Sequence, residues 1–142
     1  MNQYTNELAL YFSNPTAKIY LDQANALIYS RWFRGVLDDD WWAASEAVLN
    51  AAHETGYDAY ISDAHQGVMI DEAVARAVAE EILPKQLETN LRFLVSIIPE
   101  ELSLEIAMQT VINAFPTEMQ GSYSFTVGEA VEWIKAKRRE LR

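Results

Sequence analysis

Asp63 and His65 are the side chains of this sequence whose types and spacing best fit chemistry. They follow a short apolar segment that we expect to be a parallel strand, and ligands usually bind at the carboxyl ends of such strands. The Asp63 carboxylate could orient the imidazole of His65, which titrates near neutral pH and could serve as a general base. With Gln66 they form a candidate ligand or partner loop. We favour the alternative of a solvated loop capped by Asp63.

Other catalytic and metal-binding patterns are absent from the sequence. Without cysteine there is no disulfide, thiolate nucleophile or Cys-based zinc site. His53 suits the end of a helix, and two histidines twelve positions apart do not form a zinc site. The acidic run 38–40 lacks the spacing of a calcium loop, and phosphate-loop and hydrolase motifs are missing. We therefore predict no catalytic residue, no metal and no cofactor.

Aromatic residues crowd the junction between a predicted strand and a predicted helix. Trp32 and its neighbour Phe33 should point to opposite faces of the strand, and Trp41 and Trp42 should diverge by about 100° around the helix. Exposed Trp and Tyr are favoured at protein interfaces. The interface candidates are Tyr29, Trp32, Trp41 and Trp42. A thick aromatic core under the edge of the sheet is the alternative.

Length and composition predict one globular domain over residues 1–142. An extra strand is expected within 1–14, ahead of a core domain at 15–141 that matches the family resemblance given below. The net charge of −10 argues against nucleic acid as a partner. We expect the basic cluster near the C-terminus to complement the dipole of a C-terminal helix. It consists of Lys135, Lys137, Arg138, Arg139 and Arg142. The apolar runs are too short to span a bilayer and the N-terminus does not resemble a secretory signal, so we expect no membrane insertion and a cytoplasmic location.

Hydrophobic periodicity predicts an α/β fold with an N-terminal β-meander followed by alternating helices and parallel strands. Strands are expected at 8–12, 17–22, 27–34, 57–63, 91–98 and 122–125. Four helices are expected: from around 38–40 to a cap at 55–56, at 72–83, from near 101 to 115, and after the cap at 126. Asp38–Asp40, Gly56 and Thr126 carry the capping signals, and Pro84 should end or bend the second helix.

The chain resembles the STAS (SpoIIAA-like, anti-sigma-factor antagonist) fold, in the loose class of small bacterial STAS-like proteins of mostly unassigned function. The resemblance covers roughly residues 15–141 and rests on element order together with short segments. These are Tyr20-Leu21-Asp22, Ile28-Tyr29-Ser30-Arg31-Trp32 with Gly35, Tyr60-Ile61-Ser62-Asp63, and Phe125-Thr126 with Glu129-Ala130 and Trp133. The resemblance implies a small mixed sheet with helices packed against it, and a role in signalling through a protein partner.

One feature of the resembled family is missing. In signalling STAS domains a Ser or Thr follows the strand that matches residues 60–63 and is phosphorylated at the start of the next helix. Here the loop 63–71 contains neither residue, and Ser62 lies one position too early. We therefore expect no phosphosite in that loop, and the sequence does not decide whether Ser62 or Thr126 is phosphorylated.

Three functions remain open. The leading hypothesis is a non-enzymatic interaction or regulatory module with an unknown protein partner or acting as a homodimer. The second is a small-molecule or lipid carrier, by analogy with larger lipid-transfer domains of this broad fold class, which needs an apolar cavity. The third is an enzyme that uses Asp63 and His65, which we rank last because the sequence offers no nucleophile, metal site or cofactor motif.

Overall fold

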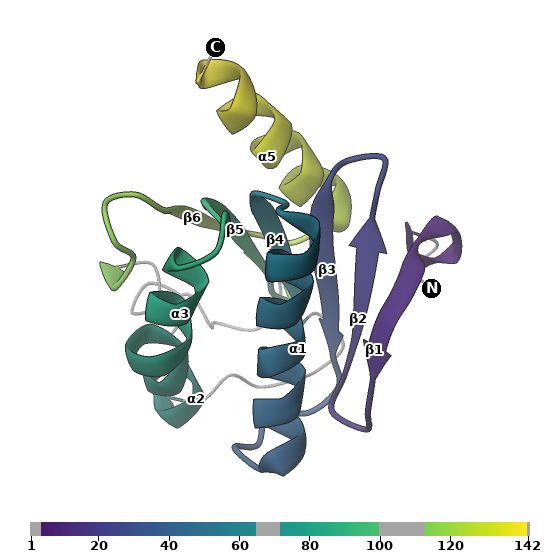
Figure 1. The fold of residues 1–142 in the computed structure, drawn as a ribbon, viewed down its shortest axis with the longest axis vertical. Helices are drawn as coiled ribbons and strands as arrows, with labels where there is room; N and C mark the ends of the chain where they lie inside the picture. Colours follow the sequence, from purple (N-terminus) through teal and green to yellow (C-terminus); the bar gives the residue numbers. More distant parts are fainter. Residues whose placement is uncertain (1–3, 65–71, 100–112, 142) are drawn as a thin grey trace.

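Six strands form one mixed sheet whose spatial order follows the sequence (Figure 1). The computed structural model describes residues 4–64, 72–99 and 113–141. Strands β1, β2 and β3 pair antiparallel, and β3, β4, β5 and β6 pair parallel. The strands are β1 Ala9–Ser13, β2 Ala17–Asp22, β3 Leu27–Trp32, β4 Ala59–Asp63, β5 Phe93–Ile97 and β6 Gln120–Ser124. This arrangement confirms the predicted α/β class, the N-terminal meander and the parallel later strands.

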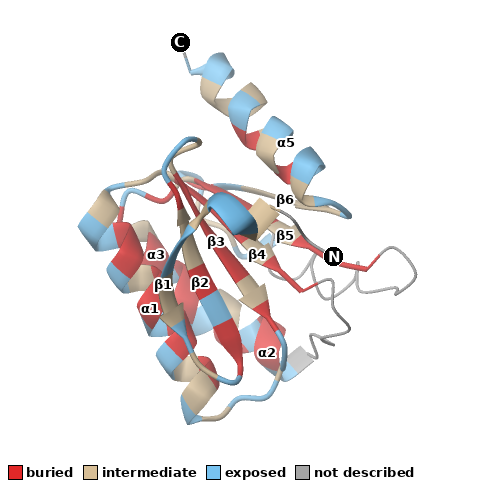
Figure 2. Cartoon of the chain, turned by 90° about the vertical axis from the view of Figure 1, so that its right-hand side faces the viewer, coloured by how far each residue is buried: buried red, intermediate tan, exposed pale blue. Residues whose placement is uncertain are grey.

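The helices cover both faces of the sheet (Figures 1 and 2). On one face lie α1 (Asp39–Thr55) and a continuous helical segment built from α2 (Glu72–Ala77), η2 (Val78–Ile82) and α3 (Leu83–Leu87). The opposite face is covered by α5 (Val127–Glu140), and a short 3-10 turn, η1 (Tyr4–Glu7), precedes the sheet. The helix predicted from residue 101 lies outside the described residues. Within the described part of the chain, no helix is both long and apolar enough to cross a bilayer.

Alternation along the strands divides the buried side chains into two clusters. In β3, Ile28 and Trp32 pack under α1, whereas Leu27 and Tyr29 pack with Ala130 and Ile134 of α5. In β4, Tyr60 belongs to the α1 side, and Ala59 and Ile61 belong to the α5 side. This is the pattern expected for strands covered on both faces, where each successive side chain finds a core. The side chains of β3 and β4 therefore alternate between two separate cores, one on each face of the sheet.

The predicted caps are in place at both long helices. Asp38 precedes α1, and its carboxylate accepts a hydrogen bond from the Trp41 backbone N–H at 3.0 Å. Gly56 ends α1 with a φ of 72°, and its N–H donates to the Ala52 carbonyl at 2.9 Å. Thr126 precedes α5, and its hydroxyl accepts from the Glu129 N–H at 3.1 Å. The Asp38 and Thr126 side chains and the Gly56 N–H thus bond to backbone groups that a helix end would leave without hydrogen-bond partners.

Pro84 bends the second helix and does not end it. Proline has no N–H to donate and its ring crowds the carbonyl four residues earlier, so an undisturbed α-helix cannot pass through it. Here the preceding turn is a π-helix over Val78–Ile82, in which the Leu83 N–H reaches back to the Val78 carbonyl. Pro84 then falls in the first turn of α3, where its missing N–H costs nothing. The helix continues to Leu87, beyond its predicted end.

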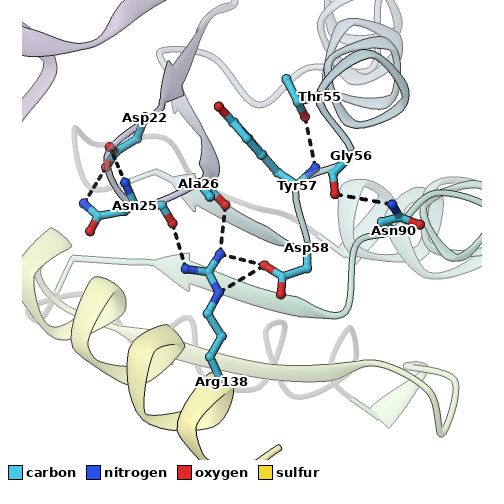
Figure 3. A network of polar contacts seen from close by, with 9 residues as sticks. All are labelled: Asp22, Asn25, Ala26, Thr55, Gly56, Tyr57, Asp58, Asn90 and Arg138. Carbon is cyan, nitrogen blue, oxygen red and sulfur yellow. Dashed lines mark hydrogen bonds and ion pairs between the residues drawn. The ribbon is translucent and has the colours of Figure 1, made fainter. Parts of the chain in front are cut away.

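One arginine fastens α5 to the amino-terminal edge of the parallel strands (Figure 3). The Arg138 guanidinium donates to the Asp58 carboxylate, just before β4, at 2.6 Å and 3.1 Å. It also donates to the carbonyls of Asn25 and Ala26, in the β2–β3 turn, at 2.7 Å and 2.8 Å. Ala26 has a φ of 51°, so the turn that presents these carbonyls is left-handed at a non-glycine residue. Arg138 is thus a structural contact within the basic cluster.

Candidate functional site

An apolar pocket lies between α1, the α2–η2–α3 segment and the adjoining face of β3, β4 and β5. Its volume is about 100 Å³. The apolar and aromatic side chains of its wall are Trp32, Trp41, Val48, Tyr60, Val74, Ala75, Val78, Ile82, Leu83, Leu94, Val95 and Phe115, and three serines, Ser45, Ser62 and Ser96, also line it. Gly35 and Ala64, which follow β3 and β4, also line it, so the pocket reaches the carboxyl ends of the parallel strands. This is the region of open α/β sheets where ligands usually bind.

The strand side of the pocket carries a hydrogen-bonded polar group that is already satisfied. The Ser30 hydroxyl lies 2.6 Å from the Tyr60 hydroxyl and accepts a hydrogen bond from the Trp32 indole N–H at 2.8 Å. Burial raises the pKa of Tyr60, because a phenolate would lose its hydration there, although the bonds from neighbouring side chains oppose the shift. At neutral pH the cluster is therefore uncharged and forms a fixed wall.

Gln86 differs from that cluster because its side chain lines the pocket without a complete set of partners. The residue is 3% exposed, and its Oε1 has no hydrogen-bond partner. Its backbone is occupied, since the Gln86 carbonyl accepts from the Thr89 hydroxyl at 2.5 Å. A buried amide oxygen without a partner loses its hydration without compensation. This oxygen is also shielded from the pocket space, so a molecule in the pocket does not contact it. Sequence patterning did not indicate Gln86, because nothing local distinguishes it from an exposed helical glutamine.

Charge is scarce around the pocket. Among the described lining residues, Arg34 alone is charged, and its guanidinium is bonded to the Asp38 carboxylate at 3.0 Å across an exposed i, i+4 pair. Arg34 stands in the β3–α1 connection, where the chain leaves the sheet. The interior therefore suits a neutral molecule, since no described acid or free base faces it.

Asp63 lies on the other face of the sheet, away from this pocket. It is the last residue of β4, is fully buried, and accepts a hydrogen bond from the Tyr29 hydroxyl, which is also buried. Its carboxylate therefore lies in the interior of the protein, bonded to Tyr29. That Asp63 caps the following loop stays a prediction, because residues 65–71 lie outside the described residues. His65 and Gln66 lie outside the described residues, so the remainder of the candidate loop stays a prediction.

Tyrosines surround the Tyr29 ring on that face. Tyr4 packs edge-on against Tyr29 with ring centroids 5.0 Å apart, and Tyr20 lies at 6.1 Å. The Tyr4 hydroxyl donates to the Asp22 carboxylate, and burial together with this bond raises the pKa of Tyr4. Aromatic side chains in edge-on contact bury large areas with defined geometry. Tyr29 is thus at the centre of a packed aromatic cluster and is fully buried.

The structure also buries most of the other aromatic interface candidates. Trp32 and Trp41 are 9% and 3% exposed, with ring centroids 6.1 Å apart, and they pack between β3 and α1. Trp42 is half-buried and contacts Trp41 edge-on at 4.8 Å. An exposed interface formed by Tyr29, Trp32 and Trp41 is therefore wrong, because Trp32 of β3 and Trp41 of α1 pack together between strand and helix, and Tyr29 is buried on the other face of the sheet. The aromatic core is the arrangement observed.

Three exposed apolar side chains lie close together in the segment that links β3 to α1. Phe33, Val36 and Leu37 are 38%, 54% and 39% exposed. We call residues 33–37 the apolar loop. Strand alternation singled out Phe33, but no pattern that we considered singled out Val36 and Leu37, although they follow Gly35 outside any periodic segment.

Among the described residues, no group of three or more His, Cys, Asp or Glu side chains could hold a metal ion. Of the acidic run, Asp38 is occupied as the cap of α1 and by Arg34. The site is thus a mainly apolar pocket, with the ion-paired Arg34 in its wall, flanked by an exposed apolar loop. No family model matches this chain, and no curated protein matches it in a sequence search.

Proposed function

We propose that this protein is a non-enzymatic interaction module of STAS-like fold that contacts a protein partner through its apolar loop. The supporting observation is the exposure of Phe33, Val36 and Leu37 within five consecutive residues. Clustered exposed apolar side chains mark interaction sites on soluble domains. The Arg34–Asp38 ion pair beside them provides the polar edge that such contact surfaces usually have.

The STAS-like assignment remains part of the proposal. It is supported by the order of strands and helices in the described residues, because the resemblance rests on that order. The partner that we propose is a separate protein, and self-association is the alternative. The acidic net charge favours a partner whose contact surface is basic around an apolar centre.

The experiment compares affinity purification of tagged wild-type protein with two variants, using gentle lysis of cells that express it. The first variant changes the apolar loop: Phe33→Ser, Val36→Ser and Leu37→Ser. The matched control places serine at exposed apolar residues elsewhere, Leu10 and Leu141, which are 57% and 70% exposed. We expect a defined protein at near-equal amount with the wild type and the control, and its loss with the loop variant.

Retention of the partner by the loop variant, or purification of the wild type alone and monomeric, would contradict the proposal. Intact mass spectrometry of the same samples tests phosphorylation. Thr126 caps α5 with its hydroxyl in the exposed first turn, and Ser62 faces the pocket from β4. An added phosphate on either residue would support a switch of the STAS kind despite the altered loop.

A second candidate function is a small-molecule carrier, which the apolar pocket favours. Its volume of about 100 Å³ is below the range of roughly 300–1,000 Å³ typical of drug-sized ligands, so a lipid is too large. The enzyme hypothesis has less support, because Asp63 is bonded to Tyr29 on the face opposite the pocket. His65→Ala tests it: full retention of every measured property would leave no catalytic residue.

A further inference from the structure

We propose that the pocket binds a small neutral molecule through a primary carboxamide group, with the hydroxyls of Ser62 and Ser96 as its hydrogen-bond partners. This inference rests on the carrier candidate and deepens it by naming the chemistry of the ligand. It does not involve the apolar loop, so its failure leaves the proposed protein contact standing. Three observations support it: a row of serines across the sheet, the access of two of them to the pocket, and the size of the space.

Three serines lie side by side on the strands that form one wall of the pocket. Ser30 of β3, Ser62 of β4 and Ser96 of β5 are in register across the parallel strands. The residues two positions before the last two, Tyr60 and Leu94, pack on the α1 side, so strand alternation places both serines on that side as well. Neighbouring strands are about 4.8 Å apart, which is therefore the spacing of the row. Ser62 and Ser96 line the pocket close to the carboxyl ends of their strands.

The hydroxyl of Ser96 is available to a ligand. Ser96 is half-buried and makes no side-chain hydrogen bond within the described part of the chain. The described side-chain atoms that are both closed off and without a partner are Thr16 Oγ1, Arg31 Nε and Gln86 Oε1, and no serine hydroxyl is among them. The Ser96 hydroxyl therefore keeps accessible surface. Because Ser96 lines the pocket on the covered face of the sheet, that surface opens into the pocket.

The hydroxyl of Ser62 has one neighbour and keeps capacity for a second bond. It lies beside the buried Tyr60 hydroxyl, where it opposes the rise in the pKa of that phenol. Like Ser96, Ser62 is half-buried and its oxygen is not closed off. A hydroxyl offers one donor and two acceptor positions, so a contact with Tyr60 leaves Ser62 able to bond a ligand. Two neighbouring hydroxyls in the pocket wall are thus ready to donate and to accept.

This pair of hydroxyls matches a carboxamide. The amide oxygen and nitrogen are bonded to one carbon and lie closer together than the strands do, so each can reach one hydroxyl at a hydrogen-bond length of roughly 2.8 Å. One serine then donates to the amide oxygen while the other accepts from the amide N–H. A carboxylate offers acceptors only, and it would lose its hydration beside a wall whose described charge, Arg34, is already bonded to Asp38.

The apolar wall and the volume determine the rest of the ligand. Trp41 and Val48 of α1 and Leu83 of α3 present carbon to the space. An apolar cavity of roughly 150 Å³ accommodates benzene, whereas this pocket measures about 100 Å³. The body of the ligand should therefore be a compact apolar group of about three carbon atoms. Isobutyramide, a branched chain of that size on a carboxamide, meets both limits.

Three molecules of similar shape separate the carboxamide from its parts. Isobutyramide carries the whole group, methyl isopropyl ketone replaces its amino group by a methyl group and keeps only the acceptor, and isobutyrate replaces it by a charged oxygen. Each is titrated into the full-length protein while NMR follows the indole N–H signals of Trp32 and Trp41, which line the pocket. We expect isobutyramide to bind about tenfold more tightly than the ketone, which is the factor that one net hydrogen bond supplies, and isobutyrate not to bind.

Serine variants assign that preference to the row. Ser96→Ala and Ser62→Ala should each weaken isobutyramide about three- to tenfold. Ser124→Ala is the matched control, because Ser124 of β6 is in register with Ile97 on the α5 side of the sheet and is not part of the pocket wall. Ser45→Leu fills the space from α1 and should remove the binding of isobutyramide and of the ketone.

Circular dichroism and thermal unfolding identify a variant that fails to fold. Ser62→Ala removes a neighbour of the buried Tyr60 hydroxyl, whereas Ser96→Ala removes no hydrogen bond to a described residue. If Ser62→Ala does not fold, Ser96→Ala therefore decides.

Four results would overturn the proposal. They are equal affinity of the wild-type protein for isobutyramide and the ketone, tighter binding of isobutyrate, equal isobutyramide affinity of Ser96→Ala and Ser124→Ala, and no binding of isobutyramide. Equal affinity for amide and ketone would leave a carrier of apolar molecules. Tighter binding of isobutyrate would assign an anion to the pocket, with Arg34 as its counter-charge. Absence of binding by all three molecules would remove the carrier candidate as well.

Discussion

The guanidinium of Arg138 and the carboxylate of Asp58 are bonded across 80 positions of sequence, with Nη2 and Oδ1 2.6 Å apart (Figure 3). Because the same guanidinium reaches two carbonyls of the β2–β3 turn, one side chain joins the last helix to two loops at the same end of the sheet. The Arg138 side chain is 22% exposed and that of Asp58 is 39% exposed, so the pair is partly shielded from solvent. The planar fork of arginine suits such contacts in a way that lysine does not.

Arg138→Ala should lower the free energy of unfolding by about 2–3 kcal/mol, because it removes hydrogen bonds from a charged group and leaves the turn carbonyls short of a donor. Arg139→Ala is the matched control, since Arg139 is the exposed neighbour with the same charge. Its effect should stay within about 0.5 kcal/mol. Urea unfolding followed by circular dichroism measures both. Equal losses for the two variants would show that net charge matters and the Asp58 contact does not.

Two glycines should respond in opposite directions to alanine. Gly56 has a φ of 72°, and an added Cβ has room, with Asn90 Nδ2 at 3.5 Å, so the cost of Gly56→Ala is backbone strain of about 1 kcal/mol. Gly128 lies inside the first turn of α5, where an added Cβ comes no closer than 3.9 Å to Thr126 Oγ1. Gly128→Ala should therefore stabilise by up to about 1 kcal/mol. Thermal unfolding of both variants checks the opposite signs, and a stabilising Gly56→Ala would contradict the left-handed cap.

Gly121 has a steric reason to be glycine. A Cβ there would lie 1.9 Å from the Phe115 ring, which packs directly on the β6 backbone. Gly121→Ala should therefore destabilise by about 1–3 kcal/mol, the usual cost of overpacking. In a Phe115→Leu background the same substitution should cost much less, because the ring is gone. A double-mutant cycle measured by urea unfolding gives this coupling, and additive effects would refute the contact.

The tyrosines predict a loss of stability in alkali. Burial raises the pKa of Tyr60 and of Tyr4, and the loss of hydration together with the bond to Glu54 raises the pKa of Tyr11 to about 12. An unfolded tyrosine ionises near pH 10, so above that pH the native state holds more protons than the unfolded state. Stability should be fully present below about pH 10 and fall as pH rises further. Tyr60→Phe should reduce the slope of unfolding free energy against pH between 10 and 11, and an unchanged slope would exclude Tyr60.

Local features of the fold were predictable from the sequence. The caps at Asp38, Gly56 and Thr126 each depend on one or two neighbouring residues, and all three are where the sequence placed them. The meander likewise follows from short apolar runs separated by turn residues. Whether the helix ends or continues at Pro84 could not be predicted, because proline can do either. The π turn that accommodates Pro84 has no sequence signature.

Features that depend on tertiary packing were not predictable. Alternation placed Trp32 and Phe33 on opposite faces, but only the position of α1 over β3 decides that Trp32 is buried while Phe33 remains exposed. Asp63 ends a predicted strand, as expected, yet its partner Tyr29 comes from the neighbouring strand. Gln86 faces a pocket only because three elements from distant parts of the sequence surround it.

Each strand after β1 pairs with the strand before it in the chain, and this order affects how the protein can fold during synthesis. Loops of three and four residues close the first two strand pairs, so the meander can form soon after it leaves the ribosome. Each later strand then meets an edge that already exists, and no strand has to insert between two others. Assembly can thus advance in one direction, with the growing edge always at the most recently synthesised strand and the Arg138 contact formed last.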